Sequence, residues 1–128
     1  MQGLRRDKFQ CIGVALQEAH AGDVWPIGLP ASLALNATFS VKDRVDNAKQ
    51  MLETLEELRE IPWFVDPPMT DANHHVAGEF NTVFAAWPHR YFVLDKEGKL
   101  LFRSPVHKKR DMEYFVSFQD LADFVETL

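Results

Sequence analysis

Short apolar runs and stretches with helical spacing alternate along the chain. Residues 9–16 form a largely apolar, partly β-branched run, which predicts a buried strand of a mostly parallel sheet. Residues 61–65 have a similar pattern and predict a second short strand. Between the two, Ser40 with Asp43 resembles the capping box of a helix. The apolar residues behind it recur at helical spacing and predict a helix over 41–58: Val41, Val45, Ala48, Leu52 and Leu55.

The second half of the chain continues with helices and a hairpin. Apolar residues at helical spacing predict a helix over 73–85. Residues 91–94 and 100–102 are apolar and flank a short turn, in which Gly98 can take a positive φ. These two runs are therefore expected to pair as antiparallel strands. Ser117 marks the start of a last amphipathic helix, with these apolar residues expected in the core: Phe118, Leu121, Phe124 and Val125.

The order strand, helix, strand, helix, hairpin, helix indicates an α/β protein. It matches the later part of a thioredoxin-like fold of the peroxiredoxin type, which has three layers around a mixed sheet. The first strand–loop–helix of that fold is expected to be missing, since residues 1–8 alone precede the first predicted strand. A length of 128 residues is typical of one domain, so we expect a single domain over residues 1–128.

Composition and charge narrow the classes of function. The net charge of -5 does not favour binding to nucleic acid or anionic lipid. The single cysteine, Cys11, excludes an internal disulfide and a cysteine-based zinc cluster. Asp71, His74 and His75 are near one another in sequence, but adjacent histidines on a helix diverge by about 100°, so no metal site is expected. No apolar run has the length of a membrane span. Cytoplasmic localisation and membrane association through a segment outside the chain both stay open.

Four stretches of the chain resemble a known family. Residues 17–25 read Q-E-A-H-A-G-D-V-W, residues 40–48 hold S-x-x-x-R, residues 65–71 read V-D-P-P-M-T-D, and residues 84–94 read F-A-A-W-P-H-R-Y-F-V-L. Together they resemble the iodothyronine deiodinases and their bacterial relatives. That family shows E-A-H-x-x-D-G-W, S-x-x-x-R, D-x-M-x-N and A-x-P-x-R-L-Y-V-I in the same order. The resemblance covers nearly all of the chain.

The resemblance implies reductive removal of iodine from an iodinated phenol such as thyroid hormone, with a thiol reductant and no cofactor. In the family a selenocysteine, or a cysteine in some bacterial relatives, attacks the iodine from a loop after the central strand. The chain holds neither that strand nor that loop, and Cys11 matches an apolar position of the following strand. We therefore expect a deiodinase-like oxidoreductase whose nucleophile is absent from these 128 residues.

Five residues make up the predicted site. By resemblance, Glu18 and His20 tune the nucleophile or protonate the ring carbon, while Trp25, Pro88 and Arg90 bind the substrate. A histidine after a predicted strand lies where α/β proteins usually place ligands, and it titrates near neutral pH. Thioredoxin-like folds commonly place a cis-proline where Pro88 stands, and the planar fork of Arg90 suits a carboxylate. The alternatives are a histidine that only ties down the long loop around it, and an arginine in a surface salt bridge.

Some positions depart from the family pattern. The family often has a histidine just before the S-x-x-x-R helix, and Thr38 or Phe39 holds that place in the chain. Val24 replaces the glycine of D-G-W, and His89 replaces the acidic residue before the arginine of the last motif. These departures concern substrate recognition rather than the fold.

Two rival functions stay open beside the deiodinase-like one. One is a peroxiredoxin-like or thioredoxin-like reductase that acts on peroxides or protein disulfides, and the other is a non-catalytic thioredoxin-fold binding module. A missing central strand would leave backbone donors and acceptors unpaired, at a cost of about 1–3 kcal/mol for each buried group. We therefore expect the isolated chain to be poorly folded or to form a homodimer through the gap.

Overall fold

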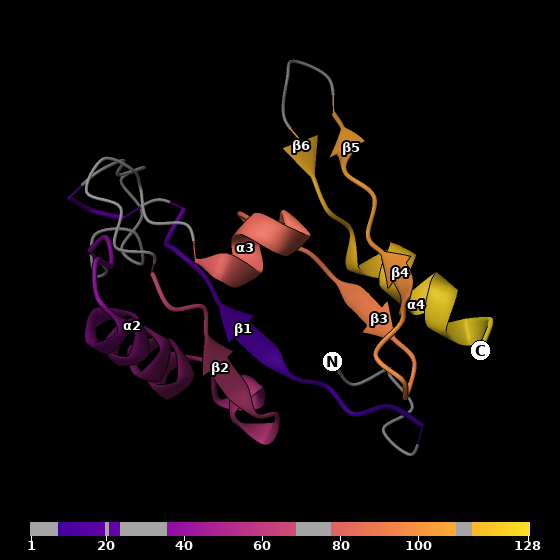
Figure 1. Cartoon of the computed structure of the whole chain (residues 1–128), viewed down its shortest axis with the longest axis horizontal. Helices are drawn as coiled ribbons and strands as arrows, with labels where there is room; N and C mark the ends of the chain where they lie inside the picture. The colour runs from indigo at the N-terminus through magenta and orange to yellow at the C-terminus, as the bar shows by residue number, and fades with distance from the viewer. Residues whose placement is uncertain (1–7, 20, 24–35, 69–77, 110–113) are drawn as a thin grey trace. The chain divides into compact units, whose positions relative to one another are not determined.

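The computed structural model describes residues 8–19, 21–23, 36–68, 78–109 and 114–128 (Figure 1). The chain divides into two compact units. One unit is Gln10–Pro88, and the other joins Met1–Phe9 to His89–Leu128. Each unit is therefore described by itself, and a single domain over 1–128 stays a prediction.

The first unit is built on two parallel strands. Strand β1 (Gly13–Ala15) pairs with β2 (Trp63–Val65) in the register Gly13–Trp63, Val14–Phe64, Ala15–Val65. Backbone hydrogen bonds continue at both ends, from Gly13 N to Pro62 O and from Asp66 N to Ala15 O, each at 2.9 Å. The parallel pairing confirms one part of the expectation for the run 9–16. The strand covers three residues of that run, and the run is not buried as expected, since Ile12 is 56% exposed.

Helix α2 (Val41–Thr54) lies alongside β2 (Figure 1). The Ser40 side chain accepts a hydrogen bond from Asp43 N at 3.1 Å, which confirms the predicted start. The predicted helix over 41–58 is divided, because α2 ends at Leu55 and a 3-10 helix, η1 (Glu56–Glu60), follows. Arg59 in η1 donates to the carbonyl oxygens of Leu52 and Glu53 at 2.5 and 2.8 Å, so its side chain satisfies acceptors at the end of α2.

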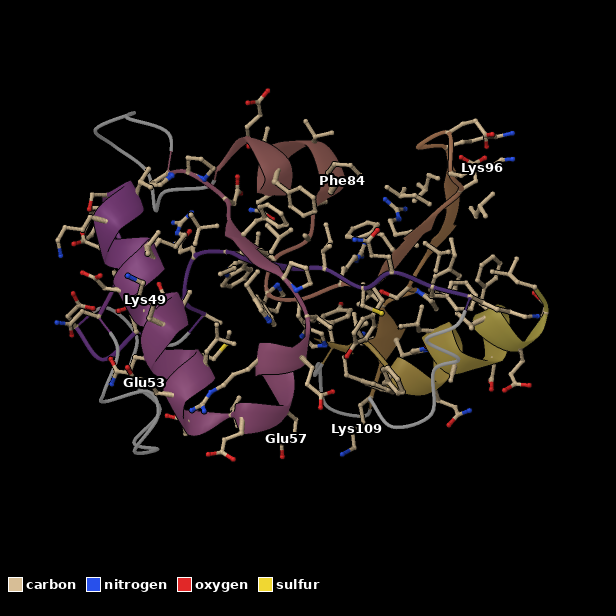
Figure 2. All side chains as sticks on the ribbon, turned by 90° about the horizontal axis from the view of Figure 1, so that it is seen from below. Lys49, Glu53, Glu57, Phe84, Lys96 and Lys109 are labelled. Carbon is tan, nitrogen blue, oxygen red and sulfur yellow. The ribbon has the colours of Figure 1, made fainter. Side chains whose placement is uncertain are left out.

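The two faces of α2 differ from the predicted pattern in one respect. Lys49 and Glu53 point outward from the exposed face, as expected (Figure 2). The ends of the predicted apolar stripe are exposed, however, with Val41 at 48% and Leu55 at 44% exposure. The buried residue of the helix is Arg44, at 1% exposure. A charged side chain therefore occupies the interior position that the pattern assigned to apolar ones.

Helix α3 (Glu79–Phe84) closes the first unit. It covers the last part of the helix predicted over 73–85, while residues 69–77 lie outside the described ranges. The rings of Phe80 and Phe84 stack with their centroids 4.6 Å apart, one turn along the same face. Ala85 follows in a left-handed conformation with φ of 48° and ends the helix.

The second unit contains two hairpins and a helix. Strand β3 (Phe92–Leu94) pairs antiparallel with β4 (Leu100–Arg103), and Gly98 has the positive φ, 83°, that the turn requires. This hairpin was predicted. A second antiparallel pair, β5 (His107–Lys108) with β6 (Tyr114–Phe115), was not predicted.

Helix α4 (Phe118–Glu126) begins after Ser117, as predicted, and the Ser117 side chain accepts from Gln119 N at 3.1 Å. Leu121 is buried, and Phe124 stacks on Phe102 of β4 at 4.7 Å between ring centroids. Phe118 is more exposed than expected, at 38%, with its ring edge against Tyr91.

The described strands form three separate two-stranded sheets, β1–β2, β3–β4 and β5–β6. A mixed three-layer sheet of the thioredoxin-like type with a further central strand therefore stays a prediction. Among the described residues, no helix has the length and apolar character that crossing a bilayer requires.

Candidate functional site

A buried polar network lies at the carboxyl ends of the two parallel strands. Glu18 follows β1 by three residues, and Asp66 follows β2 directly. Arg44 comes from the first turns of α2, and Thr38 precedes that helix. Open α/β sheets usually bind ligands outside the carboxyl ends of their strands, so this is the place where a functional site is expected.

Thr38 joins the two charged members of the network. Its hydroxyl donates to Glu18 Oε2 at 3.1 Å and accepts from Arg44 Nε at 3.0 Å. Thr38 and Arg44 are each 1% exposed, while Glu18 is half-buried. The carboxyl group of Glu18 thus faces partly toward solvent and is held from the interior side.

Asp66 holds the other end of the guanidinium. Arg44 Nη1 donates to the backbone carbonyl oxygen of Asp66. The Asp66 carboxylate turns the other way and accepts from the backbone N–H groups of Phe80 and Asn81, each at 2.9 Å. A carboxylate at that position satisfies two otherwise unpaired donors at the start of α3.

Close packing surrounds the Asp66 carboxylate. Gly78 lies so near it that a β-carbon at that position would overlap the carboxylate atoms. The chain therefore needs glycine at position 78 for space, since its φ of -81° suits any residue.

Burial lowers the pKa of Arg44, and the negative charges of Glu18 and Asp66 oppose that shift. An arginine starts from so high a pKa that its guanidinium stays charged at neutral pH. Glu18 and Asp66 therefore stabilise a buried cation, and the network is an ionic one.

A second carboxylate of the same loop secures the segment before α2. Asp23 Oδ1 accepts from Ala37 N at 2.8 Å, one residue before Thr38. Asn47 of α2 donates to the carbonyl oxygen of Asn36 at 3.0 Å. Glu18 and Asp23, both from the E-A-H-x-x-D-x-W stretch, therefore bind neighbouring residues of one segment.

The predicted site residues have different outcomes. Glu18 belongs to the network, while His20 and Trp25 lie outside the described residues. The Trp87–Pro88 peptide bond is cis, the isomer that the resemblance implies for Pro88. Arg90 is half-buried and belongs to the other unit.

Cys11 is a free, half-buried thiol that precedes β1 rather than lying within it. His107, at the start of a basic segment of the sequence, contacts an acidic residue of α4. His107 Nε2 lies 2.6 Å from Asp120 Oδ2, and the His107 ring stacks on Phe115. This histidine therefore ties the β5–β6 hairpin to α4.

Sequence reasoning did not identify Thr38, Arg44 and Asp66 as site residues, although it used all three as parts of motifs or departures from them. Thr38 or Phe39 stands in the place that the resemblance gives to a histidine. The sequence feature that could have indicated Arg44 is its position, one turn into an amphipathic helix that begins directly after a loop. Among the described residues, no three histidine, cysteine or acidic side chains gather as metal ligands.

Comparison of the chain with protein-family models, curated proteins and solved structures found no match. The functional argument therefore depends on the residues and their geometry.

Proposed function

We propose that the chain is part of a deiodinase-like oxidoreductase that removes iodine from an iodinated phenol, with a nucleophile supplied from outside these 128 residues. The observation that supports this proposal is the Glu18–Thr38–Arg44–Asp66 network. It joins three of the four stretches by which the chain resembles the deiodinases, namely 17–25, 40–48 and 65–71. Thr38, outside these stretches, provides the link between Glu18 and Arg44.

The half-buried carboxyl of Glu18 suits it to proton transfer in this reaction. A selenolate or thiolate attacks the iodine, the carbon–iodine bond breaks, and its electron pair stays on the ring carbon. Glu18 delivers the proton that this carbon takes up. One equivalent of thiol reductant then displaces iodide from the enzyme, and a second releases the resting nucleophile. The sum is one iodophenol and two thiols converted to one phenol, one disulfide and hydrogen iodide.

The test is iodide release by the protein expressed together with its upstream reading frame. An iodothyronine is the substrate and dithiothreitol the reductant. We expect release that depends on an upstream selenocysteine or cysteine. Glu18→Gln, which keeps the shape of the side chain but cannot carry the proton, should lower kcat/KM by about 100-fold.

Glu57→Gln is the matched control, since Glu57 is exposed in η1 (Figure 2), and it should retain the wild-type rate. A folded protein that reduces peroxide or a protein disulfide without releasing iodide would show a thiol reductase instead. An upstream region without cysteine or selenocysteine would exclude both redox functions and would favour the non-catalytic binding module.

A further inference from the structure

The hydrogen bonds from Arg44 to Glu18 can run in one direction only. A guanidinium has donors and no acceptor, so Arg44 Nε must donate to the Thr38 hydroxyl. A hydroxyl has a single hydrogen, and the Thr38 hydrogen is then directed to Glu18 Oε2. While the carboxyl group is ionised, Glu18 Oε2 is therefore an acceptor.

The buried end of this series of hydrogen bonds, formed by Arg44 and Thr38, is rigidly held. Arg44 and Thr38 are each 1% exposed, so solvent has little access to replace either contact. Arg44 is also bound on its far side, through Nη1, by the backbone carbonyl of Asp66. A backbone carbonyl at the end of a paired strand moves little, because Asp66 N is itself bonded to Ala15 O at 2.9 Å. The guanidinium thus holds the hydroxyl at a defined position.

One oxygen of Glu18 remains for proton exchange. Oε2 is occupied by Thr38, whereas Oε1 has no hydrogen-bond partner within the described part of the chain. Glu18 as a whole is half-buried, so solvent has access to part of its side chain.

We infer that Thr38 and Arg44 are positioning residues for Glu18, holding Oε2 of the ionised carboxylate as an acceptor so that the carboxyl group keeps a fixed orientation for taking up and delivering the proton. This inference rests on the proposed function in so far as Glu18 acts as the proton carrier. The hydrogen-bond direction itself is independent of any activity and is tested separately.

The first test is spectroscopic and uses the protein with its upstream reading frame. The Thr38 hydroxyl proton, observed by NMR, should exchange slowly with solvent. It should persist in Glu18→Gln, whose amide oxygen still accepts, and should exchange rapidly in Glu18→Ala, which removes the acceptor. A hydroxyl proton that exchanges equally in all three proteins would overturn the assigned direction.

The second test uses iodide release by the protein with its upstream reading frame. Thr38→Val removes the hydroxyl and should lower kcat by about 10- to 100-fold with KM unchanged, as expected for a misplaced catalytic group. Thr38→Ser keeps the hydroxyl and should restore most of the loss. Thr54→Val is the matched control. The Thr54 hydroxyl donates to Gln50 O on the exposed side of α2, so its removal does not touch the network.

The outcomes separate the two proposals. Equal activity of Thr38→Val and Thr38→Ser, with Glu18→Gln still impaired, would overturn the positioning role and leave the proposed function intact. Full activity of Glu18→Gln would refute Glu18 as proton carrier. The slow Thr38 hydroxyl proton would in that case still establish the direction of the hydrogen bonds.

Discussion

At the scale of single residues, the buried guanidinium of Arg44 makes the interior near the site charged and hydrogen-bonded rather than apolar. It is 1% exposed, and it contacts the Thr38 hydroxyl and the Asp66 carbonyl. Burying a charge is costly unless it is paired and hydrogen-bonded, and this guanidinium has both kinds of compensation. Removal of the charge alone would leave its partners without a donor in a space from which water is excluded.

We therefore predict that Arg44→Met lowers the free energy of unfolding by about 2–3 kcal/mol, the range for hydrogen bonds to buried charged groups. Chemical denaturation with urea measures this change. Lys42→Ala on the same helix is the control, because the Lys42–Asp46 pair at 2.5 Å is exposed, and it should leave the urea midpoint close to wild type. Equal losses in the two variants would contradict the ionic role of Arg44.

The burial of Arg44 could not be predicted from the local pattern. Helical spacing identifies which positions share a face, and Arg44 lies beside Val41 and Val45 on the inward side of that pattern. Whether a charged side chain is buried there depends on partners outside the helix, at positions 18, 38 and 66. Glu18 could be predicted, since its position after a strand and its motif are both visible locally.

At the scale of elements, α3 is held in place by a residue from another element. The Asp66 carboxylate, at the end of β2, caps the first N–H groups of α3. Gly78 provides the space for that carboxylate. The start of a six-residue helix therefore depends on a strand that precedes it by more than ten residues.

A double-mutant cycle tests this dependence. Gly78→Ala places a methyl group against the Asp66 carboxylate and should cost about 2 kcal/mol of unfolding free energy. Asp66→Ala removes the cap and should cost about 1–2 kcal/mol. Together they should cost less than the sum by at least about 1 kcal/mol, because the methyl then has room.

Gly98→Ala serves as the control in this cycle. Its cost comes from the positive φ of 83° with no neighbouring atom within 4 Å, so it should add independently to Asp66→Ala. Strict additivity of Gly78→Ala with Asp66→Ala would refute the proposed packing.

The starts of α2 and α4 could be predicted because their signals are local. Ser40 and Ser117 each cap the helix that follows them, and Gly98 forms the expected turn. The break at Leu55 could not be predicted, since it accompanies side-chain donation from Arg59 to the last carbonyls of α2. The β5–β6 pair has two residues in each strand, too few for an alternating pattern to show.

At the scale of the whole molecule, every described strand pairs with a single neighbour. Two-stranded sheets are marginally stable in water and need a further strand or a packed helix. The helices α2 and α4 supply part of that packing, through β2 and through the Phe102–Phe124 stack. The free edges of the strands remain able to pair with another chain.

We predict that the 128-residue chain self-associates at micromolar concentration, and that the protein with its upstream reading frame is monomeric. Sedimentation velocity over a range of concentrations measures both. A monomer of the 128-residue chain with a cooperative thermal melt would contradict this prediction and the missing central strand on which it depends. The thioredoxin-like arrangement itself was predicted from element order, and pairing within two-stranded sheets leaves that prediction untested.

The bond between Arg44 and Asp66 has a consequence for how related sequences can vary. Arg44 uses the backbone carbonyl of Asp66, which any amino acid supplies, whereas it uses the side chain of Thr38. Natural variation at positions 38 and 44 should therefore be correlated, with a hydrogen-bond acceptor such as a hydroxyl or an imidazole accompanying an arginine. Variation at position 66 should instead follow position 78, where glycine accompanies the acidic side chain.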